Sequence, residues 1–180
     1  MTHTAELVVR SYECDSYNHV NNAVYLNYLE FARMEYLHAC GFDYHGIVAA
    51  GYYLYVTHID IYYKASALLD DKLFIEVKPV KLKNISGEFR QKVYKEDGTV
   101  CAEASVTWAC VSSKTGRPAK LPEEFLVEGL YPDTPPSARH HVGYLACRCI
   151  AHAVNVPVYP IHAFATGAAI YCGDFKYKKQ

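Results

Sequence analysis

The stretch "DSYNHVNNAVYLNYLEFARMEYLHAC", residues 15–40, decides the fold of this chain. Its first eight residues are an acid, a histidine, three asparagines and three others, whereas the remainder is mostly apolar or aromatic. Residues 21–40 contain no glycine or proline, and Gly41 follows at the position where a helix is commonly capped. The pattern predicts one long helix over residues 21–40 that begins at a polar cluster.

The apolar residues of this predicted helix cover most of its circumference, so other structure is expected to enclose it. Strand-forming residues, β-branched and aromatic, dominate four later stretches and one earlier stretch. These stretches are residues 5–12, 52–63, 72–82, 87–96 and 99–111. Asp97 and Gly98 predict a tight hairpin between the last two, and Pro79 predicts a bulge or a sheet edge. The order predicts an α+β fold in which a curved antiparallel β-sheet wraps around one long central α-helix.

Composition limits the classes of function. The chain has 180 residues, of which 51% are hydrophobic and 21% are charged, and its net charge is −1. A globular protein is expected, without binding to nucleic acid, because no basic stripe is present. No run of about 18 apolar residues predicts a membrane span, and the N-terminus does not resemble a signal peptide. The seven irregularly spaced cysteines favour reduced thiols in a cytoplasmic protein.

The composition changes near residue 133. Residues 1–133 hold 18 acidic and 13 basic side chains, whereas residues 134–180 hold one acidic and five basic side chains. We expect one domain over 1–133 and a C-terminal extension of unclear structure over 134–180. The extension contains potential soft-metal ligands, namely His140, His141, Cys147, Cys149 and His152. Their Cys-x-Cys spacing is not that of a typical zinc site, so no metal site is predicted.

Three blocks of the sequence resemble hot-dog-fold thioesterases, both the 4-hydroxybenzoyl-CoA thioesterase family and the acyl-ACP thioesterases. The first block is "HVNNAVYLNYLEFAR" (19–33), and the third is "SVTWACVSSKTGRPAKLPEEF" (105–125). The second, "IYYKASALLDDKLFIEV" (61–77), is similar to Tyr-x-x-Pro-x-x-x-Gly-Asp in the family. Here Tyr63 and Asp71 match, while Ser66 replaces the proline and Asp70 the glycine. The resemblance covers about residues 5–130.

The resemblance implies an enzyme that hydrolyses acyl-CoA or acyl-ACP thioesters to a carboxylic acid and a thiol. It places the catalytic carboxylate, as base or nucleophile, at Asp15, and the backbone N–H that polarises the thioester carbonyl at Asn22. The resemblance also implies that His19 orients the reacting groups or assists the reaction. The segment departs from the acyl-ACP thioesterases at Tyr17, where they have an asparagine. No metal or other cofactor is implied. The family forms dimers, often tetramers, with sites between subunits, so a homodimer or homotetramer is expected.

A polar cluster directly before a helix is suited to catalysis for a chemical reason. The first backbone N–H groups of a helix lack partners within the helix, and the helix dipole adds partial positive charge there. Such groups can stabilise the oxyanion that develops during acyl transfer. The polar cluster therefore precedes the helix because the helix start would be the electrophilic end of a site.

Plainer roles for these residues remain open. Asp15, Asn21 and Asn22 are residue types favoured before helices, and His19 could be a structural hydrogen-bonding group. Within the helix, Glu30 is interpreted as an ion-pair partner of Arg33, the alternative being a second carboxylate at the site.

Two other functions also stay open on the sequence. One is an acyl-CoA hydratase or dehydratase on the same fold, and the other is a non-catalytic acyl-binding protein.

Overall fold

The structure, a computed structural model, describes residues 2–132 of the 180. The extension expected over 134–180, with its histidines and cysteines, lies outside the described residues. Among residues 2–132, no helix is long and apolar enough to cross a membrane.

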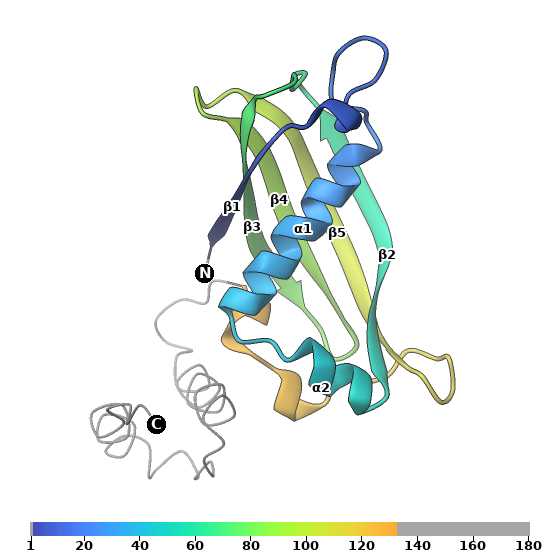
Figure 1. The fold of residues 1–180 in the computed structure, drawn as a ribbon. Helices are drawn as coiled ribbons and strands as arrows, with labels where there is room; N and C mark the ends of the chain where they lie inside the picture. The colour runs from blue at the N-terminus through green and yellow to red at the C-terminus, as the bar shows by residue number, and fades with distance from the viewer. Residues whose placement is uncertain (1, 133–180) are drawn as a thin grey trace, which may run out of the picture. The chain divides into compact units, whose positions relative to one another are not determined.

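A five-stranded antiparallel sheet and one long helix make up the described domain (Figure 1). The strands lie in the order β1-β3-β4-β5-β2, and α1 lies across one face of the sheet. The elements are β1 (His3–Val8), α1 (Val24–Ala39), α2 (Tyr44–Ala49), β2 (Tyr52–Tyr63), β3 (Lys72–Leu82), β4 (Ser86–Lys95) and β5 (Val100–Ser112). This is the predicted α+β, hot-dog architecture.

The predicted long helix and the four later strands are confirmed to within a few residues. On β5, Ala102, Ala104, Val106, Trp108 and Cys110 are all buried, as the alternation predicts, and they face α1. The pairing of β3 with β4 shifts by one residue directly after Pro79, which confirms the bulge. The turns at Gly41 and Gly98 both need a positive φ, 71° and 86°, which glycine adopts without strain.

Two segments differ from prediction. The strand predicted over 5–12 ends at Val8, and Ser11–Glu13 form a 3₁₀ turn instead. The Glu13 carboxylate closes this turn by accepting a hydrogen bond from the Arg10 N–H at 2.7 Å. The short helix α2 was not predicted, because six residues are too few to reveal a helical period of apolar residues. Its N-terminus is capped by the Asp43 side chain.

The expectation that α1 is enclosed on nearly all sides is wrong for the single chain. Leu26 and Phe31 on α1 are 38% and 40% exposed. The physical reason is that α1 packs closely against β1 and β3, at one side of the sheet, and less closely against β2. The inner face of β2 is consequently open as well, and Val56 there is 46% exposed.

Candidate active site

The loop before α1 folds back on itself as a small hairpin. Cys14 and Val20 form an antiparallel bridge, and the Asp15 N–H donates to the His19 carbonyl at 2.8 Å. Asn18 stands at the tip with φ of 61°, a conformation that asparagine tolerates better than most residues. The hairpin brings the polar cluster predicted from sequence into one compact turn next to the helix.

Two backbone donors fix the orientation of the Asp15 carboxylate. Its Oδ1 accepts hydrogen bonds from the N–H groups of Tyr17, at 2.8 Å, and His19, at 3.3 Å. Its Oδ2 accepts no hydrogen bond from any residue in the described range. One oxygen is therefore held in place while the other is available to a proton or a carbon electrophile.

Asn22 presents an unpaired backbone donor at the start of α1. Asn21 accepts hydrogen bonds from the two backbone N–H groups that follow Asn22. Its side-chain oxygen accepts from the Ala23 N–H at 2.9 Å, and its carbonyl accepts from the Val24 N–H. The Asn22 carbonyl accepts from the Tyr63 hydroxyl at 2.9 Å. Within residues 2–132 the Asn22 N–H has no acceptor, so it remains free for a ligand at the positive end of the helix.

The three residues predicted from the resemblance line one open cavity of about 310 Å³. Asp15, His19 and Asn22 supply one wall, and the segment 63–68, of which residues 63–66 line the cavity, supplies the opposite wall. The imidazole of His19 is exposed, while its backbone pairs with Leu68 of that second wall. The structure thus brings together every predicted site residue in one solvent-accessible hollow beside the start of α1.

Sequence reasoning did not assign Tyr25 or Tyr63 to the site, and both line the cavity. Their rings meet edge to face, with centroids 5.4 Å apart. Burial, aided by the nearby Cys101 thiol, raises the pKa of Tyr25 to about 12. Tyr25 therefore keeps its proton at neutral pH. The match of Tyr63 to the family block was the signal that could have placed the second wall at the site.

A buried carboxylate below the loop ties it to α1. Glu13 is 7% exposed, and it accepts a hydrogen bond from the Tyr28 hydroxyl of α1 at 2.8 Å. Its carbonyl accepts from the Asn21 N–H at 2.9 Å, immediately before Asn22. Burial and the hydrogen bond to Glu13 raise the pKa of Tyr28, so the hydroxyl stays a donor. Glu13 thereby joins the start of the hairpin loop, residues 14–20, both to its end at Asn21 and to α1 at Tyr28.

The second wall is braced in a similar way. The Asp71 carboxylate accepts from the Leu68 N–H at 2.8 Å and pairs with the Lys95 ammonium at 2.8 Å. Burial alone would raise the pKa of Asp71, but these hydrogen bonds and the charge of Lys95 outweigh it and lower that pKa. The Val20 N–H donates to the carbonyl of Ala67 in this wall at 2.9 Å, which joins the two walls.

The expected ion pair between Glu30 and Arg33 is wrong. The Arg33 guanidinium donates instead to the Gln91 side chain at 2.8 Å, and the Gln91 amide donates to the Leu29 carbonyl at 2.9 Å. Burial lowers the pKa of Arg33, although the charge of Glu30 acts in the opposite direction. Gln91 of β4 thus bonds the middle of α1, although it lies 58 residues after Arg33 in the sequence.

Within the described residues no three His, Cys, Asp or Glu side chains cluster in the manner of metal ligands. The polar groups of the residues that line the cavity are a carboxylate, an imidazole, two phenols, the Lys64 ammonium, the Ser66 hydroxyl and the backbone and side-chain amides of Asn22.

A curved antiparallel sheet around one helix, with a polar hairpin at the helix start, defines a hot-dog-fold protein. Residues 9–128 match the profile of the thioesterase-like superfamily. Because this match spans well over half of the chain, the chain belongs to that superfamily.

Curated relatives and solved structures agree with this assignment. The chain is 35% identical over 120 residues to the long-chain acyl-CoA thioesterase FadM of Escherichia coli (strain K12), covering 66% of this chain and 90% of FadM. It is 30% identical over 109 residues to the acyl-CoA thioester hydrolase YbgC of Escherichia coli O6:H1, covering 61% and 81%. The crystal structure of YbaW from Escherichia coli superposes with a TM-score of 0.61 at 35% identity, covering 68% of this chain and 92% of YbaW.

Proposed function

We propose that this protein hydrolyses acyl-CoA or acyl-ACP thioesters to a carboxylic acid and a thiol. The observation that carries the proposal is the pairing of two groups in one cavity: a carboxylate with a free oxygen, Asp15, and an unpaired helix-start amide, that of Asn22. The named activities of the relatives FadM and YbgC support the same reaction.

In this mechanism the Asn22 N–H donates to the thioester carbonyl oxygen and stabilises the oxyanion as it forms. Asp15 takes a proton from a water molecule, whose oxygen then bonds to the carbonyl carbon. The tetrahedral intermediate collapses, the C–S bond breaks, and the leaving thiolate receives the proton from Asp15. His19 assists by holding Asp15 through its backbone N–H and by lining the approach of the thiol.

In a second route Asp15 acts as the nucleophile, and a covalent intermediate forms. Asp15 attacks the carbonyl carbon itself, the thiolate leaves, and water hydrolyses the resulting mixed anhydride. Label from ¹⁸O-labelled water that is found in the Asp15 carboxylate after a single turnover identifies the anhydride route, because water oxygen enters that carboxyl only by attack on the Asp15 carbonyl carbon of the anhydride.

The assembly that fits this site is at least a homodimer, formed through β2. This strand lies at the sheet edge, is 12 residues long, and leaves Tyr55, Val56 and Tyr62 between 46% and 63% exposed. A long apolar edge strand presents unpaired backbone N–H and C=O groups with which another chain can pair. Leu26 and Phe31 of α1 supply further apolar surface. Light scattering at micromolar concentration should give a dimer or tetramer; a monodisperse monomer would contradict the assembly.

The proposed thioesterase domain comprises residues 1–133, and the family match that ends at residue 128 supports this boundary. We place the activity in the cytoplasm, because the four cysteines of the described range are free thiols.

A thiol-release assay across short, long and aryl acyl-CoAs tests the proposed reaction. The expected result is release of one thiol per thioester with at least one of these substrates. Crotonyl-CoA is included because a hydratase would hydrate it without releasing thiol. Binding of acyl-CoA with no thiol release from any substrate would overturn the proposal.

A further inference from the structure

Glu13 is the one acidic side chain that is buried within residues 2–132, and the mechanism above gives it no chemical step. Burying a carboxylate costs free energy unless hydrogen bonds replace the water that it loses. Glu13 does not line the site cavity, so it does not contact a substrate bound there. A role of this carboxylate in the reaction would therefore act through its neighbours.

The hairpin of residues 14–20 spaces the two groups that the proposed mechanism uses. Asp15 lies near the start of the hairpin, and Asn22 follows its end. The main-chain carbonyl of Glu13 accepts from the Asn21 N–H at 2.9 Å, so these two residues pair at the base of the hairpin. Asp15 moves with the hairpin, whereas the Asn22 N–H is fixed at the start of α1. The angle between the hairpin and the helix therefore sets the spacing of the two groups.

The Glu13 carboxylate joins the base of the hairpin to the body of α1. Its Oε2 accepts from the Tyr28 hydroxyl at 2.8 Å and from the Arg10 N–H at 2.7 Å. The Arg10 guanidinium lies 3.5 Å from the other oxygen, but its side chain is 62% exposed, so this ion pair contributes little. Tyr28 lies about 9 Å beyond Asn22 along the helix axis. This second attachment, in addition to the one at Asn21, prevents the hairpin from tilting about the helix start.

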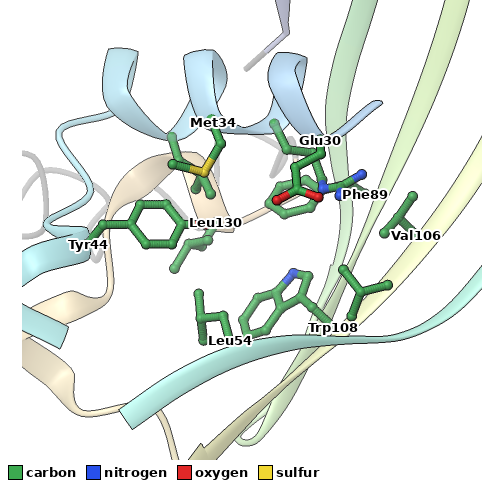
Figure 2. A pocket seen from close by; sticks show the side chains of 11 residues that line it. Glu30, Met34, Tyr44, Leu54, Phe89, Val106, Trp108 and Leu130 are labelled. Atoms are coloured by element: carbon green, nitrogen blue, oxygen red, sulfur yellow. The ribbon is translucent and has the colours of Figure 1, made fainter. Parts of the chain in front are cut away.

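Helix α1 is fixed to the sheet independently of Glu13. Arg33, the other charged side chain that is buried among the described residues, donates to Gln91 of β4 at 2.8 Å. It borders a cavity of about 90 Å³ beneath the later part of the helix, where Glu30 of α1 lies across from Trp108 of the sheet (Figure 2). Because this contact lies in the middle of α1, the helix stays in place if the hairpin is released.

The hairpin also keeps its own hydrogen bonds without the carboxylate. The Asp15 N–H donates to the His19 carbonyl at 2.8 Å, and the Val20 N–H donates to the Ala67 carbonyl at 2.9 Å. Loss of the bond to Tyr28 is therefore expected to tilt the hairpin without unfolding it. A misplacement of about 1 Å between reacting groups lowers a rate by as much as ~10²-fold.

We propose that Glu13 is a positioning residue for thioester hydrolysis: through Tyr28 it holds the Asp15 carboxylate at its working distance from the Asn22 N–H. The inference rests on the proposed function, because it requires both groups to act on one thioester. The effect comes from hydrogen bonding rather than from charge, since both donors share one oxygen of Glu13. The chemical step is the one affected, so kcat depends on Glu13 and KM does not.

Tyr28→Phe tests the inference from the helix side, because it removes the hydroxyl and keeps the ring. Thiol release should give a kcat at least about tenfold below that of the wild type, with KM within about twofold. The matched control is Tyr36→Phe on the same helix, which removes the hydroxyl that donates to the Gly129 carbonyl at 2.6 Å. Both tyrosines are buried, so both variants lose stability, but Tyr36→Phe should keep the wild-type kcat. All rates are measured below the onset of thermal unfolding of each variant.

Two further variants separate positioning from a purely structural role. In Glu13→Gln the amide oxygen takes the place of Oε2 and accepts from both donors, so kcat should stay within about threefold of the wild type. In an Asn22→Pro background the amide is absent, so the distance that Glu13 sets no longer matters. Adding Tyr28→Phe to that background should lower kcat by less than about threefold, which is a non-additive result.

A wild-type kcat in Tyr28→Phe would overturn the inference and leave the proposed function intact. An equal fall in Tyr36→Phe would do the same, because the effect would then be one of helix stability. A tenfold fall in Glu13→Gln, or full additivity with Asn22→Pro, would also overturn it. Absence of thiol release by the wild type with every acyl-CoA would instead overturn the proposed function, and this inference with it.

Discussion

Replacing Asn22 with proline separates the backbone donor from the asparagine side chain. Proline lacks an N–H and is well tolerated near the start of a helix. Because the Asn22 N–H has no acceptor within the described residues, the substitution breaks no hydrogen bond of the described domain. The expected loss is therefore one oxyanion donor, which typically lowers kcat by ~10²–10³, equivalent to ~2.7–4 kcal/mol of transition-state stabilisation.

The matched control is Asn22→Ala, which keeps the N–H and removes only an exposed side chain. Its kcat should stay within about twofold of the wild type, on the same scale of oxyanion-donor effects. Both variants are assayed for thiol release, and their thermal unfolding is compared to show that the fold is retained. Equal kcat values for the proline and alanine variants would refute the role of this amide, whether both are active or both inactive.

Three further results are expected. Tyr28→Phe leaves the buried Glu13 carboxylate without its helix partner, so urea denaturation should show a loss of ~1–3 kcal/mol; an unchanged midpoint would mean that the pair does not brace the loop. The lowered pKa of Asp71 stabilises the fold above its unfolded pKa of about 4, and this contribution is lost as pH falls through the folded pKa. Asp71→Asn should therefore reduce the loss of unfolding free energy at acid pH by less than ~1 kcal/mol, because the side chains of Asp71 and Lys95 are both partly exposed. Gly87→Ala places a methyl group against the Trp108 ring and should cost ~1–3 kcal/mol in the same denaturation assay; a neutral effect would show that the indole is not fixed.

The sequence predicted the elements whose signal is local and periodic. The alternation on β5 and the long stretch of α1 without glycine or proline were sufficient to predict both elements, and the structure shows which face of each is buried. The first strand was predicted to extend too far because Tyr12 favours strands, whereas the actual turn depends on the Glu13 carboxylate accepting a hydrogen bond from the Arg10 N–H.

Contacts between distant residues could not be predicted. Glu30 and Arg33 have ion-pair spacing, yet Gln91 on β4 takes the guanidinium because the strand lies directly beneath that side of α1. Likewise, the hydrogen bond of Tyr63 to the Asn22 carbonyl joins residues 41 apart. The resemblance predicted Asp15, His19 and Asn22 as site residues, but only the structure shows which oxygen and which N–H have no partner within the described residues.

The most direct test of the central claim is thiol release by Asp15→Asn. Asparagine retains the oxygen that accepts from the Tyr17 and His19 N–H groups, but it can neither take up a proton as a base nor attack as a carboxylate. With the best acyl-CoA substrate, kcat should fall by ~10²-fold or more, while Asp70→Asn, an exposed acid outside the cavity, should remain at the wild-type rate. Asp15→Asn with wild-type turnover would contradict the account.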